Sequence, residues 1–338
     1  MLQLIRILGH IQAWSSNCGT SLMIKTLGAL IISCLTWAAA VAEDIPPPRA
    51  SDVRYHIEIP KGGLPAFLKW QPMRIPMISH HRSGPSKGFP ENAIETMDHV
   101  LAYGPGMMEI DVATLADGTM ILMHDDTFNR TTTGEGLVSL ASWESVSKFK
   151  LIDDVGSVTD FAVPTLEAAL RWTIGRAILT LDIKRGTDFA KVAALVAKTG
   201  ADDYVVAIAY TLDQAKEFHA AAPTMPITIT MRNDDEIAAV LASGIPSELV
   251  VAWTGTERLP SDHYQALHDK GWRVIMGTLG GARSIDTQIA ANDNDKRYLS
   301  IYNQGVDVIA TDRFWAVQRQ IQNPNFFLFT KKQAVSAE

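Results

Sequence analysis

Cysteine is almost absent from this chain of 338 residues. The two that occur, Cys18 and Cys34, lie close to the N-terminus, and no thiol follows them. A disulfide framework and a cysteine-ligated metal site are therefore excluded for the rest of the chain. Any metal bound there must take oxygen or nitrogen ligands.

An excess of positive charge is also missing. The chain has 30 Lys and Arg residues against 37 Asp and Glu residues, a formal net charge of -7 and a pI near 5.7. Because a polyanion is bound by an extended basic surface, nucleic acid is not expected as a partner. A small anionic substrate is still compatible with this composition, because it needs only a local group of cations.

Internal repeats, low-complexity tracts and a recognisable domain boundary are absent after the N-terminal region. With 47% hydrophobic and 20% charged residues, a chain of this length can bury one large core. We therefore predict one domain over residues 72–330, preceded by a Pro-rich lead-in segment at 43–71 and followed by a C-terminal tail at 331–338.

The first 42 residues have the pattern of a signal peptide. From Met23 a lysine precedes an apolar run that ends in Ala40-Val41-Ala42, a small-residue cleavage site. Translation could start at Met1 or at Met23. The pattern predicts a periplasmic or secreted protein with no stable membrane span after cleavage.

Two alternatives to this cleavage stay open. The apolar run could be retained as a membrane anchor, although a span needs about 18 apolar residues. Cys34 follows Ile31-Ile32-Ser33 in a sequence similar to a lipoprotein box, so it could instead carry a lipid anchor.

Short apolar runs of strand length alternate with amphipathic stretches along the domain. The strand candidates are residues 76–79, 107–112, 119–123, 177–183, 204–209, 225–230, 249–252, 273–276 and 306–310. The helix candidates are residues 91–103, 165–174, 188–198, 212–221, 234–242, 261–270 and 285–303. Strands alternating with helices indicate a parallel sheet covered on both faces. The pattern predicts an α/β fold, an irregular (β/α)8 TIM barrel.

Three features make the predicted barrel irregular. There are nine strand candidates for eight places, and residues 249–252 are the weakest of them. Residues 113–118 are too few for a crossover helix, so they form a hairpin or an extended return. Residues 134–163 show no clear strand and are predicted to be a small insertion after the third strand, near the barrel mouth.

Ionisable residues gather where the predicted strands end. His81 and Arg82 end the first strand, Glu109 and Asp111 the second, His124 the third, and Asp182 and Lys184 the fourth. In a barrel these carboxyl ends meet at one mouth, which is where active sites lie. The i, i+2 spacing of Glu109 and Asp111 also places both carboxylates on one strand face.

The chemistry of these residues suits a phosphate ester. Three carboxylates without a thiol form a hard, oxygen-rich site for Mg²⁺ or Ca²⁺, although a salt-bridged cluster is the alternative. Arg82 offers a planar fork for phosphate oxygens and Lys184 a point charge. His81 and His124 can serve as general base and general acid, because imidazole titrates near neutral pH.

At these residues the chain resembles the glycerophosphodiester phosphodiesterase family. The matching segments are His81-Arg82 with Gly84, Pro90-Glu91-Asn92, Glu109-Ile110-Asp111, His124-Asp125, Arg130-Thr131-Thr132, Pro164-Thr165-Leu166-Glu167, Asp182-Ile183-Lys184 and residues 305–312. The resemblance covers residues 75–314, and the ordered set is far more specific than any single piece.

The resemblance implies a function and a role for each residue. The function is metal-dependent hydrolysis of glycerophosphodiesters to sn-glycerol 3-phosphate and an alcohol. The implied roles are acid and base for His81 and His124, divalent-metal ligands for Glu109, Asp111 and Asp182, phosphate binding for Arg82 and Lys184, and supporting or purely structural contacts for Glu91, Asn92, Asp125 and Glu167. The alternatives are a phospholipase D-like enzyme acting on lysophospholipid or sphingolipid headgroups, and an inactive barrel used as a binding protein.

The chain departs from the family pattern at three positions. Asp182 stands where the family usually has Glu. His80 precedes His81, and because adjacent strand residues face opposite ways, only one can face the site; we predict His81, because Arg82 follows it. Gly277 replaces an aromatic residue and is expected to widen the alcohol side of the pocket, while Trp253 is expected to serve in packing.

Overall fold

The computed structural model describes residues 45–48, 53–72 and 75–322. Its contacts divide the chain into two units, Met1–Ile45 and Pro46–Glu338, and the elements below all belong to the second. The predicted signal peptide and C-terminal tail lie outside the described residues. Within the described ranges, no helix combines the length and apolar character needed to cross a bilayer.

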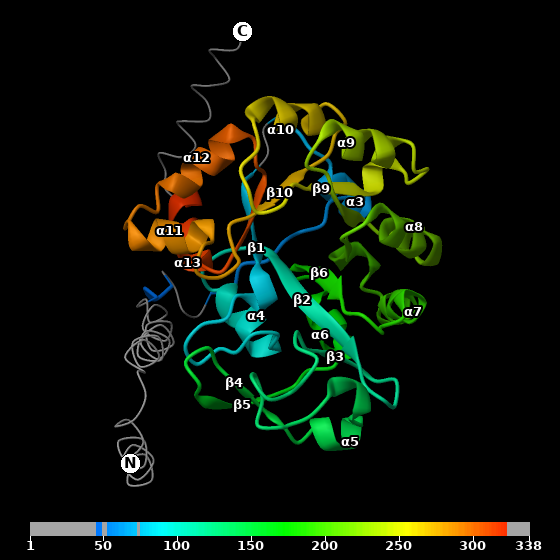
Figure 1. The fold of residues 1–338 in the computed structure, drawn as a ribbon, viewed down its shortest axis with the longest axis vertical. Helices are drawn as coiled ribbons and strands as arrows, with labels where there is room; N and C mark the ends of the chain where they lie inside the picture. Colours follow the sequence, from blue (N-terminus) through cyan, green and yellow to red (C-terminus); the bar gives the residue numbers. More distant parts are fainter. Residues whose placement is uncertain (1–44, 49–52, 73–74, 323–338) are drawn as a thin grey trace, which may run out of the picture. The chain divides into compact units, whose positions relative to one another are not determined.

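Eight parallel strands close into a barrel, which confirms the predicted (β/α)8 fold (Figure 1). In order around the barrel they are β1 (Met77–His80), β2 (Met107–Thr114), β6 (Ile178–Ile183), β7 (Val205–Ala209), β8 (Ile227–Thr230), β9 (Val250–Trp253), β10 (Val274–Gly277) and β11 (Val308–Thr311). Closure depends on β1, which pairs with β11 on one side and with β2 on the other.

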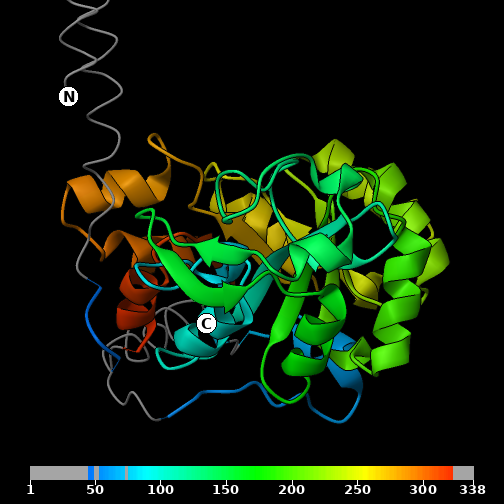
Figure 2. The ribbon, with the colours of Figure 1, turned by 90° about the horizontal axis from the view of Figure 1, so that it is seen from below.

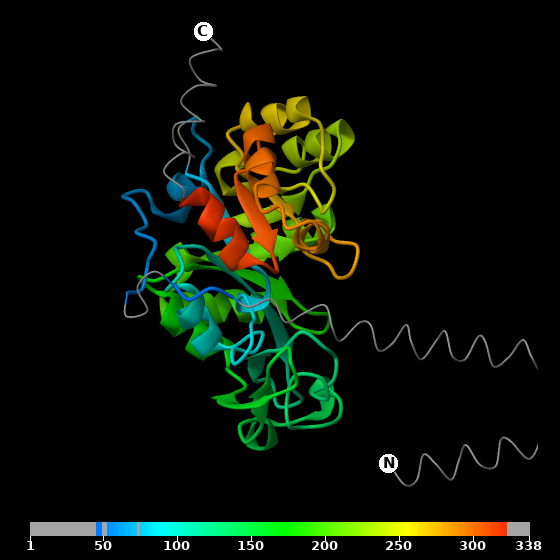
Figure 3. The ribbon, with the colours of Figure 1, turned by 90° about the vertical axis from the view of Figure 1, so that its left-hand side faces the viewer.

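Helices follow most of the barrel strands and cover their outer faces. They are α4 (Ile94–Val100), α6 (Leu166–Thr173), α7 (Phe189–Thr199), α8 (Leu212–Ala221), α9 (Asp234–Leu241), α10 (Ser261–His268), α11 (Ile285–Ala291), α12 (Arg297–Gln304) and α13 (Phe314–Ile321). Side-chain caps begin several of them; Thr211, for example, forms a capping box with Gln214 at the start of α8. Figure 3 shows α13, in red, lying against the strands.

One helix prediction was too long. The stretch 285–303 forms two helices, α11 and α12, because the chain turns between them. Asp293 lies in this turn with a φ of 46°, a left-handed conformation that an α-helix does not tolerate.

The surplus strand candidate is β3 (Met120–Leu122), which lies outside the barrel. It pairs antiparallel with the extended end of β2, so residues 113–118 form a hairpin, with Gly118 at a φ of 85°. The weakest candidate, residues 249–252, is instead a true barrel strand, β9, between β8 and β10. The assumption that His124 ends a barrel strand was therefore wrong, because it follows the returning arm of the hairpin.

The insertion at residues 134–163 contains strands that the sequence did not reveal. β4 (Lys150–Ile152) and β5 (Val158–Ala162) form a two-stranded antiparallel sheet, preceded by the short α5 (Trp143–Val146). Both strands are short, and β5 is open to solvent at alternate residues, so neither produces a continuous apolar run. Figure 1 shows the insertion below the ring of barrel strands, and Figure 2 looks onto the insertion from that side.

The lead-in closes the N-terminal end of the barrel. Helix α3 (Gly63–Leu68) inserts Leu64 and Leu68 into a core that includes Met77 and Met107, the first residues of β1 and β2. Upstream, the backbone N–H of Tyr55 donates to Leu101 and that of Ile57 to Arg176. With this end plugged, the opposite end is left for a site.

Truncating Leu64 tests the plug. Leu64→Ala should lower the free energy of unfolding by about 2–4 kcal/mol, because a fully buried side chain is replaced by a cavity. Urea unfolding measures this, with Leu241→Ala as the matched control, since Leu241 is 53% exposed. Equal losses in the two variants would show that α3 does not support the barrel.

Candidate active site

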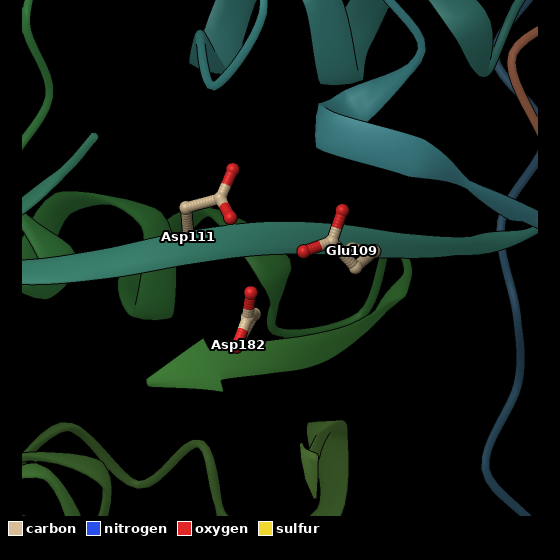
Figure 4. Close-up of side chains that lie close together, drawn as sticks. All are labelled: Glu109, Asp111 and Asp182. Atoms are coloured by element: carbon tan, nitrogen blue, oxygen red, sulfur yellow. The ribbon is translucent and has the colours of Figure 1, made fainter. Parts of the chain in front are cut away.

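Three carboxylates meet at the C-terminal end of the barrel strands. Glu109 and Asp111 lie on β2, and Asp182 lies beside Asp111 on the neighbouring β6. One oxygen from each carboxylate lies within 4.8 Å of the others. Figure 4 shows the three side chains converging from the two strands. The parallel register of β2 and β6 thus brings together acids that are far apart in the sequence.

The charges of this cluster are only partly balanced. Nζ of Lys184 lies 2.6 Å from Asp111 and 2.6 Å from Asp182. Burial opposes ionisation of Asp111, but Lys184 and Asn92 hold its pKa below the ordinary value. Within the described part of the chain, Glu109 has no side-chain ion pair, and burial together with Asp111 raises its pKa to about 8.

The cluster has the chemistry of a divalent-cation site. It offers hard oxygen donors only, as Mg²⁺ and Ca²⁺ prefer. Lys184 pairs with Asp111 and Asp182 only, so the salt-bridged alternative leaves Glu109 without a cationic side-chain partner in salt-bridge contact among the described residues. The residues present therefore fit such an ion.

A strained turn after β1 supports the cluster. Arg82, Ser83 and Gly84 follow one another at φ values of 50°, 74° and 79°. For a residue other than glycine this conformation costs about 1–3 kcal/mol, and it persists where surrounding contacts impose it. Here the turn directs the backbone N–H of Arg82 to Glu109 at 2.7 Å.

Asn92 connects the same turn to β2. It is buried at a φ of 58°, and its backbone N–H donates to the carbonyl of Arg82. Its side chain donates to Asp111 at 2.7 Å and accepts from the Asp111 backbone at 2.9 Å. Asn92 thus fixes the orientation of a carboxylate in the cluster.

Five side chains form a closed ring of polar contacts beside the cluster. Arg82 donates to Glu91 at 3.1 Å and to Nε2 of His124 at 2.7 Å. His124 donates through Nδ1 to Asp125 at 2.7 Å, and Arg130 joins Asp125 to Glu91 through four hydrogen bonds of 2.7–2.9 Å. The hydrogen bond from Arg130 is the main reason that the pKa of Asp125 is lowered. The ring holds the tautomer of His124, because Nε2 accepts and Nδ1 donates.

His81 has a separate carboxylate partner. Its Nδ1 donates to Asp312, which follows β11, at 2.6 Å. Burial alone would lower the pKa of His81, but the hydrogen bond to Asp312 and the charge of Glu109 outweigh it, and the pKa is raised. Asp312 is positioned in turn by Asp286, whose carboxylate accepts from the Asp312 backbone at 2.8 Å.

His80 faces the opposite way, as strand alternation predicts. It is 1% exposed and packs edge-on against Phe314, with ring centroids 5.5 Å apart. Burial lowers its pKa to about 3, so it stays neutral. Of the two adjacent histidines, His81 is therefore the one beside the carboxylate cluster.

Glu167 is not brought to this site, although the motif that contains it suggested a supporting contact. It lies in the first turn of α6, where its carboxylate pairs with Arg171 at 2.7 Å and with Lys198 at 3.3 Å. These partners belong to helices on the outside of the barrel, so the contacts are structural.

Several site residues were missed in the sequence. Arg130 and Asp312 lie inside segments that carry the family resemblance, so motif position could have singled them out. Tyr210 directly follows β7, and its pKa is raised by burial and then by the charge of Asp182. Its position after a barrel strand was the available signal. Asp286 had none, because its contacts depend on folding.

The expected widening at Gly277 is wrong. A Cβ at Gly277 would lie 2.8 Å from the ring of Trp253 and 3.0 Å from Thr256. The indole at the end of β9 therefore fills the space that a side chain at the end of β10 would need. Trp253 also packs against the barrel core, which confirms its expected role in packing.

A cavity of about 370 Å³ opens beside His81 and Arg82.

The fold and the site together define a class of protein. It is a (β/α)8 barrel whose mouth combines a carboxylate cluster suited to a divalent cation with two histidines and an arginine. The sequence profile of the glycerophosphoryl diester phosphodiesterase family matches residues 81–314, and the chain belongs to this family.

Individual relatives agree with this membership. A glycerophosphoryl diester phosphodiesterase structure from Parabacteroides distasonis has 32% identity and a TM-score of 0.73, covering 80% of this chain and 93% of that one. A phosphodiesterase from Oleispira antarctica, solved with the product sn-glycerol 3-phosphate, shares the fold at 20% identity and a TM-score of 0.56, over 74% of this chain and 98% of that one. A glycerophosphodiester phosphodiesterase from Caldanaerobacter subterraneus is 37% identical over 76 residues, 22% of this chain but only 30% of that relative.

Glu91 offers a test of the ring. Glu91→Gln should lower the free energy of unfolding by about 1–3 kcal/mol, because it removes the charge that two arginines share at a buried position. Glu95→Gln, on the exposed side of α4, is the matched control and should change stability by less than about 0.5 kcal/mol. Chemical denaturation measures the free energy of unfolding of both variants, and equal losses would contradict the stabilising role of Glu91.

Proposed function

We propose that this protein hydrolyses glycerophosphodiesters to sn-glycerol 3-phosphate and an alcohol, using a divalent cation and two histidines. The observation that carries the proposal is the placement of Arg82 between the carboxylate cluster and His124, next to His81. Family membership and the 32% identical relative from Parabacteroides distasonis support the same substrate class.

The phosphate would bind between the acidic cluster and Arg82. Glu109, Asp111 and Asp182 would hold Mg²⁺ or Ca²⁺, which when bound supplies positive charge to the phosphate oxygens. The guanidinium of Arg82 and the ammonium of Lys184 are placed to contact the same phosphate. Lys184 is already oriented by Asp111 and Asp182, and Arg82 by Glu91 and His124.

The two histidines would divide the proton transfers. His81 acts as general base on the attacking hydroxyl, and Asp312 stabilises the imidazolium that forms. A new bond from that oxygen to phosphorus forms as the bond to the alcohol breaks. His124 would act as general acid through Nε2: when Arg82 turns from this nitrogen to the phosphate, Nε2 takes up a proton and gives it to the leaving alkoxide, while Asp125 holds Nδ1.

The attacking hydroxyl would come from the glycerol of the substrate. Family resemblance supports this route, in which the first product is a cyclic phosphate. In the second step His81 and His124 exchange roles, and water opens the ring to give sn-glycerol 3-phosphate. Both steps use the same two positioned imidazoles.

We also propose that the mature protein is periplasmic or secreted. The support is the lysine, apolar run and small-residue cleavage pattern between Met23 and Ala42.

Metal removal tests the cation site. Purified mature protein incubated with glycerophosphocholine should release glycerol 3-phosphate, and EDTA should abolish the release. Added Mg²⁺ or Ca²⁺ should restore it, because the cluster provides only oxygen ligands. If glycerol 3-phosphate release continues unchanged in EDTA, the proposed cation requirement is refuted. If no release occurs under any condition, the proposed substrate is refuted.

Replacing each adjacent histidine tests the acid–base assignment. His81→Asn should lower kcat about 10²–10⁴-fold, as expected when a general base is lost. His80→Ala should keep its turnover per folded molecule, because its ring is buried away from the cluster. Circular dichroism gives the folded fraction for each variant. Full activity in His81→Asn would refute the assignment.

A further inference from the structure

The cavity beside His81 extends away from the carboxylate cluster. Its lining residues are His81, Arg82, Pro85, Glu91, Arg130, Asp154, Gly280, Gly281 and Asp312. Glu109, Asp111 and Asp182 are not among them. A phosphate held at Arg82 would therefore have the proposed cation on one side and this cavity of about 370 Å³ on the other. The cavity has room for the substrate group that lies beyond the phosphate.

The insertion provides one residue of this cavity lining, Asp154. It lies in the turn between β4 and β5, and in the described residues its carboxylate has no hydrogen bond or ion pair. The side chain is open to solvent, yet the protein around it and the charge of Glu91 raise its pKa to about 6. The charge of Arg130 lowers the pKa but does not outweigh these effects, so at neutral pH Asp154 is a negative charge that has no cation in salt-bridge contact among the described residues.

The neighbouring residue fixes this turn in place. Asp153 is buried, and its carboxylate accepts from the backbone of Gly88 at 2.7 Å, in the loop that follows β1. The same carboxylate accepts from the backbone of Val155 at 3.1 Å and of Ser157 at 2.7 Å within the turn. Asp154 is thus held against the cavity by a built contact between the insertion and the barrel.

The other charges of the cavity do not satisfy Asp154. Arg130 is engaged by Glu91 and Asp125, and Arg82 by Glu91 and His124. The cavity is lined by three carboxylates, Glu91, Asp154 and Asp312, and by two guanidinium groups, Arg82 and Arg130. With Arg82 taken by the phosphate, three carboxylates face one guanidinium, so the rest of the cavity is better matched to a cation than to an anion.

We propose that Asp154 selects the alcohol part of the substrate and favours diesters whose alcohol carries an ammonium group, such as choline or ethanolamine. This inference rests on the proposed hydrolysis and specifies which alcohol the enzyme prefers. The ammonium supplies the positive charge that Asp154 lacks, while the phosphate stays at Arg82.

The experiment compares a cationic with an uncharged alcohol. Steady-state kinetics are measured on glycerophosphocholine and on glycerophosphoglycerol for the unaltered protein, Asp154→Asn and Asp154→Lys. Asp154→Asn should raise KM for glycerophosphocholine about fivefold with little change in kcat, as expected for one partly exposed ion pair. Asp154→Lys should raise it further, and neither variant should weaken turnover of glycerophosphoglycerol.

The matched control is Asp160→Asn, which removes an exposed charge from β5 of the same hairpin and should leave both substrates unchanged. Equal effects of Asp154→Asn on the two substrates, or none, would overturn the role of Asp154 while leaving the hydrolysis intact. If the unaltered protein turns over neither substrate, the proposed function fails, and the inference fails with it.

Discussion

Repulsion among three carboxylates is the constraint around which the barrel mouth is arranged. Two unit charges about 4 Å apart near a protein surface repel by on the order of 4 kcal/mol. The register of β2 and β6 nevertheless brings Glu109, Asp111 and Asp182 to one point. The neighbouring contacts offset part of this cost: Lys184 between two acids, the backbone N–H of Arg82 at the third, and Asn92 at Asp111. Three carboxylates in one place lower the stability of the protein without a bound cation, and the same negative charge favours the binding of a divalent cation.

The two histidines are held by different means. His81 depends on Asp312, which is anchored by the buried Asp286, so its support comes from the last strand of the barrel. His124 is held by Asp125 in the ring that Arg130 and Glu91 complete. The ring also fixes the orientation of Arg82. Each imidazole therefore has its own carboxylate, and the two can carry protons in opposite directions.

The two ends of the barrel have separate tasks. Leu64 and Leu68 of α3 seal the N-terminal end with buried apolar contacts. The C-terminal end carries strained backbone at Arg82 and Asn92, like-charged side chains and an open cavity. The insertion, through Asp153 and Asp154, adds a wall to that cavity without disturbing the strands beneath it.

The amino-acid sequence by itself determined the barrel and most of its polar residues. Apolar runs alternating with amphipathic stretches are a local property, so all eight barrel strands were among the nine strand candidates, and the site could be expected at the ends of these strands. The motifs similarly singled out His81, Glu109, Asp111, His124 and Asp182 as one group. Short strands with few apolar residues, as in the insertion, produce no such periodicity and were missed.

Only the tertiary structure decided which residues act on one another. Strand pairing places Thr119–Met123 outside the barrel and the weaker run at 249–252 inside it. A local sequence pattern contains no information on which strands pair. Glu167 lies on the outer face of the barrel, and Trp253 fills the space beside Gly277, because helix orientation and packing set these contacts. The ring through Arg130, the pair of His81 with Asp312 and the position of Asp154 join residues up to 231 apart in the chain. Such contacts are set by the closure of the barrel, since closure is what brings its first and last strands together.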